Sequence, residues 1–247
     1  MASPASEAPP ETTSAAAPEP TEDPDLPSND DIEMFISAIA SSSTSELEAA
    51  TDLVQADSPA ANYLTYYSHN VNAQIDAGLS GLNEPADVEE SDNGFQTCIT
   101  EAGEKHCTSY SDFEGKEGLI TDFQVQQRDL ADRLAVGSGE TISGPDGSEI
   151  EFVAAYMNAQ DTHLLLAFNV RSGSTETNLS TSSYRGEDGR QSQAEDFYGS
   201  WELAPDSMSS YVAMFPDASL GGEAHLDIWT ETNAPPTTLT MPTSDSE

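Results

Sequence analysis

Apolar residues recur at helical spacing in successive segments after residue 28. The first predicted helix begins at Ser28 or Asn29, either of which can accept hydrogen bonds from the first turn. Its apolar face consists of Ile32, Phe35, Ile36 and Ile39. A second helix is predicted from Ser43, because Glu46 three residues later completes a capping-box pattern. Two short amphipathic helices are therefore expected at the start of the folded part.

A third and longer helix is predicted after Ser58. Ser58 is a good N-cap residue, and Pro59 suits the first helical position because its missing N–H would have no partner there. The apolar face is expected to contain Leu64, Tyr67, Val71 and Ile75. Gly78 or Gly81 would end this helix.

From about residue 95 the apolar period changes from the helical value to two. Residues 95–100 and 105–113 are rich in β-forming side chains and flank the turn signal at residues 101–104, so a hairpin is predicted. Residues 119–125 alternate apolar and polar positions and predict a third strand. Three helices followed by an antiparallel meander predict an α+β domain over residues 29–135.

Everything between residues 136 and 229 has the pattern of short strands. The Gly- and Ser-rich segment at residues 136–139 predicts a linker. Strands are then expected at residues 149–156, 163–170, 201–203, 210–215 and 224–229. This spacing predicts an all-β, immunoglobulin-like sandwich over residues 136–229.

The two ends have low-complexity composition. Residues 1–28 contain seven prolines among Ala, Ser, Thr, Glu and Asp, and residues 230–247 contain three prolines among threonines. Repeated prolines and like charges disfavour helices and strands. We therefore expect a disordered acidic Pro/Ser/Thr stalk over residues 1–28 and a disordered tail over residues 230–247.

The charge of the chain excludes several classes of partner. The 247 residues carry 45 acidic and 7 basic side chains, a formal net charge of −38, and no Lys or Arg precedes Lys105. Nucleic acids and anionic membranes both require Lys and Arg to neutralise phosphates, so neither is an expected partner. The excess of acidic side chains can also be explained without a partner: it keeps a protein soluble, and it would suit a cytoplasmic protein of a salt-tolerant organism.

The sequence contains no run of apolar residues long enough to predict a transmembrane helix. Met1 leads directly into Ala/Ser/Pro/Glu-rich sequence without the basic and apolar regions of a signal peptide. A mature exported protein whose leader has been removed would begin in the same way. The cysteines decide which interpretation to prefer.

Cys98 and Cys107 lie symmetrically about Ala102 and Gly103. A two-residue turn there would make the cysteines directly opposed, in a non-hydrogen-bonded pair close enough for a disulfide. A three-residue loop would shift the register, and reduced buried thiols remain an alternative. Metal ligation with His106 is disfavoured, because His106 and Cys107 would point to opposite faces of the strand. A disulfide favours an oxidising, extracytoplasmic location.

The order of elements resembles a known family. Three helices, a hairpin with paired cysteines, and then the segments at residues 108–114 and 118–123 resemble the SnoaL-like, or nuclear-transport-factor-two-like, cone fold of exported actinobacterial proteins. Residues 149–156, 164–170, 215–218 and 221–222 resemble the telokin-like immunoglobulin-type sandwich that often follows it. The resemblance implies a lipoprotein whose anchoring cysteine would precede this sequence, since no cysteine lies near Met1.

Cone folds can enclose a pocket, and some relatives are isomerases, cyclases or dehydratases. The resemblance therefore implies a possible pocket lined by Tyr63, Tyr66, Tyr67, His69 and Asp122. Aromatic core packing, with the tyrosine hydroxyls at the rim, is the favoured explanation of the same tyrosines. The sequence indicates no catalytic residue, cofactor or metal site.

The function expected from these observations is a noncatalytic cell-surface or secreted protein, derived from a lipoprotein, that binds or scaffolds an envelope protein or surface ligand. One alternative is a small-molecule-binding protein or isomerase-like enzyme that uses the cone pocket. A second alternative is a cytoplasmic, salt-adapted protein with reduced cysteines.

Overall fold

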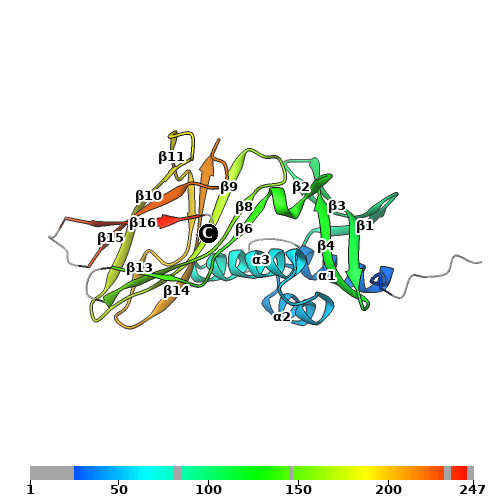
Figure 1. Cartoon of the computed structure of the whole chain (residues 1–247), viewed down its shortest axis with the longest axis horizontal. Helices are drawn as coiled ribbons and strands as arrows, with labels where there is room; N and C mark the ends of the chain where they lie inside the picture. The colour runs from blue at the N-terminus through cyan, green and yellow to red at the C-terminus, as the bar shows by residue number, and fades with distance from the viewer. Residues whose placement is uncertain (1–24, 80–84, 145–146, 231–234, 244–247) are drawn as a thin grey trace, which may run out of the picture.

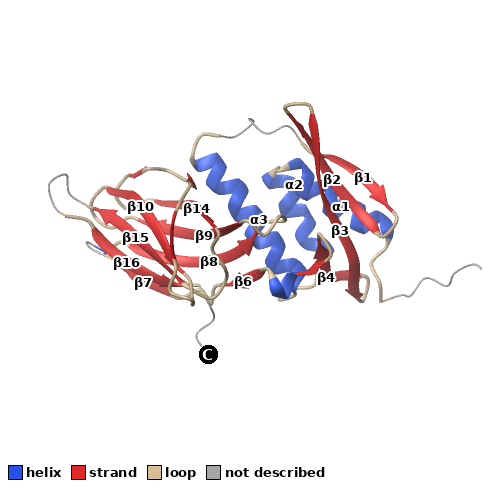
Figure 2. Cartoon of the chain, turned by 90° about the horizontal axis from the view of Figure 1, so that it is seen from above, coloured by secondary structure: helices blue, strands red, loops and turns tan. Residues whose placement is uncertain are grey.

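The computed structural model describes residues 25–79, 85–144, 147–230 and 235–243, and in these residues the protein is mostly β. Strands make up 47% of the chain and form three antiparallel sheets. Two sheets lie face to face at one end of the elongated molecule, the third lies at the other end, and helix α3 lies between them (Figures 1 and 2).

The α-helices of the described residues all precede the first strand. They are α1 (Asn29–Ser41), α2 (Thr44–Ala49) and α3 (Pro59–Asp76), and the 3-10 turn η1 (Ala50–Leu53) follows α2. The predicted starts of α1 and α3 are confirmed: Ser28 Oγ accepts a hydrogen bond from the Asp31 N–H at 3.1 Å, and Ser58 Oγ accepts one from the Ala61 N–H at 3.2 Å.

The predicted start of α2 is only partly confirmed. The helix begins after Ser43, but the Ser43 side chain makes no capping hydrogen bond and instead contacts Ser45 Oγ at 3.0 Å. The capping-box prediction is therefore wrong, although the helix exists. At the other end of the helical part, Gly78 adopts a positive φ of 75° and its N–H donates to the Ile75 carbonyl, which ends α3 as predicted.

The N-terminal sheet has the order β1-β2-β3-β4-β5. Its strands are β1 (Asp87–Ser91), β2 (Gly94–Glu101), β3 (Glu104–Lys116), β4 (Leu119–Val125) and β5 (Arg128–Asp129). The predicted hairpin is β2–β3, and Ala102 and Gly103 form its turn with φ values of 52° and 87°. Positive φ at both positions is typical of the tight turn whose twist matches that of the flanking strands.

The other two sheets pack face to face. The inner sheet has the order β12-β14-β9-β8-β6, with β7 also paired to β8, and the outer sheet has the order β11-β10-β15-β16, with β13 paired to β10. The inner strands are β6 (Leu134–Val136), β7 (Thr141–Ser143), β8 (Glu149–Met157), β9 (His163–Arg171), β12 (Asp196–Tyr198) and β14 (Met208–Pro216). The outer strands are β10 (Thr177–Arg185), β11 (Gln191–Gln193), β13 (Glu202–Leu203), β15 (Glu223–Trp229) and β16 (Thr237–Pro242).

The inner sheet is buried on both faces. Leu164, Leu166 and Phe168 of β9 face the outer sheet, whereas Ala167 between them belongs to the core formed by the helices and the N-terminal sheet. The same core includes Tyr156 of β8. Helix α3 thus packs between the N-terminal sheet and the inner sheet (Figure 2).

The predicted fold class, an α+β cone-like domain followed by a separate immunoglobulin-like sandwich, is therefore wrong. The chain is mostly β with three antiparallel sheets, and the three short α-helices of the described residues do not form a separate α+β half. The physical reason is that α3 buries side chains against two sheets at once, so the helices and the inner sheet share one core. The unbroken apolar run of β9 agrees with a strand that is covered on both sides.

Strand β6 spans the expected boundary between residues 135 and 136. The expected linker begins within this strand, which pairs with β8, and the Gly137 N–H then donates to the Val153 carbonyl at 2.9 Å. A Cβ at Gly137 would lie 1.9 Å from the Phe152 carbonyl oxygen. Glycine is needed there for close approach of two backbones, and the segment is not a free linker.

The C-terminal end also differs from expectation. Residues 237–242, predicted to be part of a disordered tail, form strand β16 at the edge of the outer sheet and bury Leu239 and Met241 in the core between the two sheets. Apolar and polar residues alternate over residues 239–241, but this segment is too short, and too rich in neighbouring threonines and prolines, to have predicted a strand. A stalk was predicted over residues 1–28, and residues 1–24 of it lie outside the described residues.

One buried cation links the parts of the molecule. Arg133 follows the 3-10 turn η2 (Leu130–Asp132) and is 1% exposed. Its guanidinium donates to the Val125 carbonyl at 2.9 Å, to the Asn158 carbonyl and to the Asp161 carboxylate, and it lies 5.8 Å from the ring centre of Tyr156. Arg133 therefore connects β4 with the β8–β9 turn.

Candidate functional site

Five tyrosines gather where α3 meets the sheets. Tyr63, Tyr66 and Tyr67 come from α3, Tyr110 comes from β3 and Tyr156 comes from β8. The ring centres of Tyr63, Tyr66, Tyr67 and Tyr156 lie 4.7–6.2 Å from those of neighbouring tyrosines. These rings form much of the wall of a pocket of about 290 Å³, here called the tyrosine pocket.

The phenols of the tyrosine pocket stay neutral far into the alkaline range. Burial raises the pKa of Tyr63 and Tyr66 well above the usual value, and it raises the pKa of Tyr156 to about 12. A neutral phenol can donate one hydrogen bond and accept others. The tyrosines therefore present ring faces and neutral hydroxyl groups, without a phenolate that could act as a base near neutral pH, and His106, Asn158 and Gln160 also line the pocket.

His69, another residue of the predicted pocket, does not line the tyrosine pocket. It lies on α3, and its Nε2 is 3.1 Å from the Phe168 carbonyl oxygen of the inner sheet. Burial lowers the pKa of His69, against weaker opposing effects of backbone carbonyls and of Glu151 and Asp76. The ring borders a different cleft, of about 600 Å³, beside Glu151. Its contacts are those of a residue that ties a helix to a sheet.

Asp122 is also separate from the tyrosines that line the pocket. It lies on β4, where its Oδ1 accepts a hydrogen bond from the Phe123 N–H at 2.8 Å. Partial burial raises the pKa of its carboxyl group, and nearby Glu114 and Asp129 raise it further. Of the residues predicted to share a pocket, Tyr63, Tyr66 and Tyr67 meet, whereas His69 and Asp122 lie elsewhere. No carboxylate lines the tyrosine pocket among the residues that the structure describes.

The predicted disulfide is confirmed. Cys98 of β2 and Cys107 of β3 are directly opposed and bonded, with Cα atoms 4.2 Å apart. This short distance is that of a non-hydrogen-bonded pair, as the turn at Ala102 and Gly103 requires. Within the described ranges, no three His, Cys, Asp or Glu side chains are grouped so that they could hold a metal ion.

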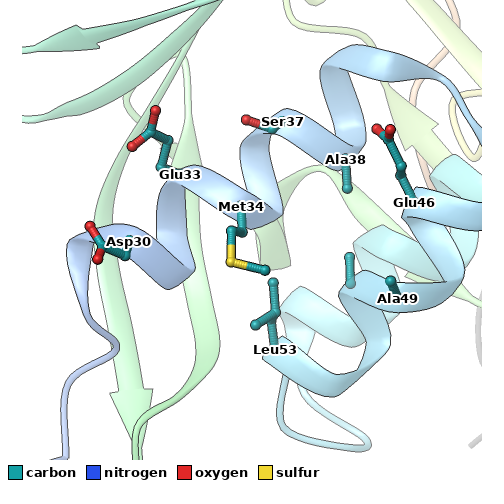
Figure 3. Close-up of a pocket in the computed structure, with 9 residues that line it drawn as sticks. Asp30, Glu33, Met34, Ser37, Ala38, Glu46, Ala49 and Leu53 are labelled. Atoms are coloured by element: carbon teal, nitrogen blue, oxygen red, sulfur yellow. The ribbon is translucent and has the colours of Figure 1, made fainter.

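A third hollow, lined by the first helices, was not predicted. It is an open groove of about 470 Å³ between α1 on one side and α2 with η1 on the other, here called the α1–α2 groove (Figure 3). Its apolar lining comes from Met34, Ala38, Ala49, Ala50 and Leu53. Three carboxylates, those of Asp30, Glu33 and Glu46, and the hydroxyl of Ser37 complete the lining.

Met34 is the unusual residue of the α1–α2 groove. It is 60% exposed, and its thioether extends across the groove toward Leu53 (Figure 3). Besides Leu53, the apolar positions of the facing wall are Ala49 and Ala50, whose small side chains leave space between the helices. Ile32, Phe35, Ile36 and Ile39 point to the core instead, so Met34 belongs to the outward face of α1.

Two of the three carboxylates of the groove lie at helix starts. Asp30 lies in the first turn of α1 and Glu46 in the first turn of α2, where the helix dipole stabilises negative charge. The dipole explains why acidic residues are tolerated there, but it does not explain an exposed methionine between them. The only sequence signal for the groove was an apolar residue on the polar face of the first predicted helix.

Comparison with known proteins identified no matching family model, no similar curated protein and no similar solved structure. None of the described helices combines the length and apolar character needed to cross a membrane.

Proposed function

We propose that this chain is a noncatalytic binding protein of an oxidising, extracytoplasmic compartment, and that it holds a protein partner of the envelope in the α1–α2 groove. The observation that carries the proposal is the groove itself: an exposed Met34 over an apolar floor, on a chain with a formal net charge of −38. Exposed apolar patches rimmed by polar residues are typical of interaction sites.

The disulfide supports the compartment. Cys98 and Cys107 form a bond that would be rare in the reducing cytoplasm, and it braces the hairpin on which the N-terminal sheet depends. This bond argues against a cytoplasmic, salt-adapted protein, which would carry reduced thiols.

The tyrosine pocket supports a small-molecule function less well. Its volume of about 290 Å³ lies at the lower limit for ligand sites, and its tyrosine rings pack against one another. His69 and Asp122, the residues expected to provide acid–base chemistry there, lie elsewhere, and His106, which does line the pocket, is exposed to solvent. Aromatic packing accounts for this cluster.

Site-specific photo-crosslinking tests the proposed function. A photoreactive amino acid would replace Met34 in one variant and Ile75, which is 42% exposed at the end of α3, in a matched control. We expect envelope fractions of the producing cell to give a discrete protein adduct from position 34 and none from position 75. Equal adducts from both positions, or none from position 34, would contradict the proposal.

A further inference from the structure

The rim of the α1–α2 groove has one sign of charge. Asp30 and Glu33 lie along α1, and Glu46 projects from α2 on the other side, so carboxylates flank the apolar floor on both walls (Figure 3). All three are exposed. An occupant must therefore bring an apolar group to Met34 and Leu53 and also tolerate negative charge on either side.

No cation of the helical part offsets this charge. The first basic residue of the sequence is Lys105, so α1, α2, η1 and α3 contain neither Lys nor Arg. Lys105 itself pairs with Glu89 at 2.6 Å on the N-terminal sheet. The missing positive charge would have to come from the occupant, and clefts lined by one sign of charge attract ligands of the other.

Two occupants from this chain are disfavoured by the same charge. A second copy would bring another formal charge of −38 and, in a symmetric contact, would place two sets of the same carboxylates together. Residues 1–24 and 244–247 contain acidic residues but no Lys or Arg. Neither a second copy nor an end of the chain complements the rim.

The shape of the groove favours a helical segment. Helix α1 has 13 residues and forms a wall about 20 Å long, and α2 with η1 forms the facing wall. A partner helix lying between two helices inserts apolar side chains at helical spacing into such a groove. Methionine adapts to different side chains because its thioether chain is flexible and polarizable.

We propose that the occupant of the α1–α2 groove is a cationic amphipathic helix of another protein, whose apolar face covers Met34 and Leu53 and whose Lys or Arg side chains pair with Asp30, Glu33 and Glu46. This inference rests on the proposed function, because it names the chemistry of the partner at the same site. It predicts that both the apolar contact and the charges are needed.

A synthetic helix-forming peptide with leucines on one face and lysines on the other is the direct probe. Its binding to the full oxidised chain would be measured by fluorescence anisotropy at about 0.15 M salt, where the Debye length is about 8 Å and distant charges contribute little. A matched peptide with glutamates in place of the lysines is the first control. We expect the lysine peptide to bind and the glutamate peptide not to bind.

Substitution of Met34 separates docking from general attraction between opposite charges. The Met34→Asp variant removes the apolar contact and adds a carboxylate, so docking in the groove predicts a loss of affinity of about tenfold or more. Attraction by net charge alone predicts unchanged or tighter binding. Met208→Asp is the matched control, because Met208 is 57% exposed on β14, and it is expected to leave affinity within about twofold.

The carboxylates are tested together by the triple variant Asp30→Asn, Glu33→Gln and Glu46→Gln. We expect the triple variant to bind the lysine peptide about tenfold more weakly and to show a smaller dependence of affinity on salt concentration. All four positions are exposed, and circular dichroism with a melting curve would confirm that each variant folds. Unchanged affinity of Met34→Asp, unchanged affinity of the triple variant or equal binding of the glutamate peptide would overturn the inference.

The two proposals can fail separately. An adduct from position 34 in envelope fractions, together with no binding of the lysine peptide, would leave the binding function in place and refute the cationic helix. Absence of the adduct would refute the proposed function itself.

Discussion

Replacing Arg133 tests how the molecule is held together. Arg133 is the largest fully buried side chain among the described residues, and it is one of only seven basic residues in the sequence. Its guanidinium donates to Val125 of β4 and to Asn158 and Asp161 of the β8–β9 turn. In Arg133→Met the aliphatic volume is largely kept, whereas all three hydrogen bonds are lost.

The expected loss follows from these contacts. A hydrogen bond from a charged donor contributes about 1.5–3 kcal/mol, and two main-chain carbonyls would lose such a donor. Asp161 keeps a second partner, Arg128, at 2.7 Å, so its charge would not be left unpaired. Burial of the guanidinium costs free energy that methionine does not incur, and the buried Nε of Arg133 already lacks a partner. We therefore expect a net loss of about 3 kcal/mol, or a decrease in Tm of about 6–12 °C.

Urea denaturation followed by circular dichroism would measure this loss. The control is Arg190→Met, which also removes one positive charge, at a side chain that is 86% exposed. It is expected to change stability by no more than about 0.5 kcal/mol. Arg133→Lys should remain destabilised, because an ammonium group cannot reproduce the planar fork that reaches both carbonyls. If Arg133→Met were no less stable than Arg190→Met, the linking role of Arg133 would be refuted.

Three further predictions concern the core and its titration. Met241→Ala should lower the free energy of unfolding by about 2–4 kcal/mol, whereas Thr240→Ala on the exposed face of β16 should change it little; equal losses would contradict the burial of this strand. The lowered pKa of His69 means that the unfolded state binds more protons below about pH 6.5, so unfolding at pH 5 should be easier than at pH 7.5, and His69→Gln should reduce this difference. An unchanged pH dependence of stability in His69→Gln would count against the lowered pKa of His69. Burial raises the pKa of all eight tyrosines, so the native protein at pH 10 should show little phenolate absorbance at 295 nm, while the protein in denaturant should show about half of the full signal. Equal absorbance of the native and denatured protein at pH 10 would refute the raised pKa of the tyrosines.

Local signals allowed much of the structure to be predicted. Ser28 and Ser58 cap helices because a side-chain oxygen can reach an N–H two or three residues ahead, whatever the rest of the fold does. The Ala102–Gly103 turn determines which residues oppose one another in the hairpin, and the disulfide follows from that register. These features depend on neighbours in the sequence.

Apart from the capping box at Ser43, the incorrect predictions concern contacts between distant segments. Nothing near α3 in the sequence indicates that Tyr66 packs on Tyr156 of the inner sheet, so the helix was assigned to a domain of its own. Strand β16 has only Leu239 and Met241 as buried apolar residues, and its partner β15 supplies the rest of the pattern. The α1–α2 groove exists because alanines of α2 and η1 face Met34, which is a property of packing.

Methyl spectroscopy of the methionines tests the central claim most directly. The sequence has six methionines, and Met34→Leu would assign the signal of Met34 in a spectrum of protein labelled at the methionine methyl carbons. Titration with the lysine peptide should shift the Met34 signal and leave that of Met208, which is almost as exposed, in place. An unmoved Met34 signal, or equal shifts at Met34 and Met208, would contradict the α1–α2 groove as the binding site.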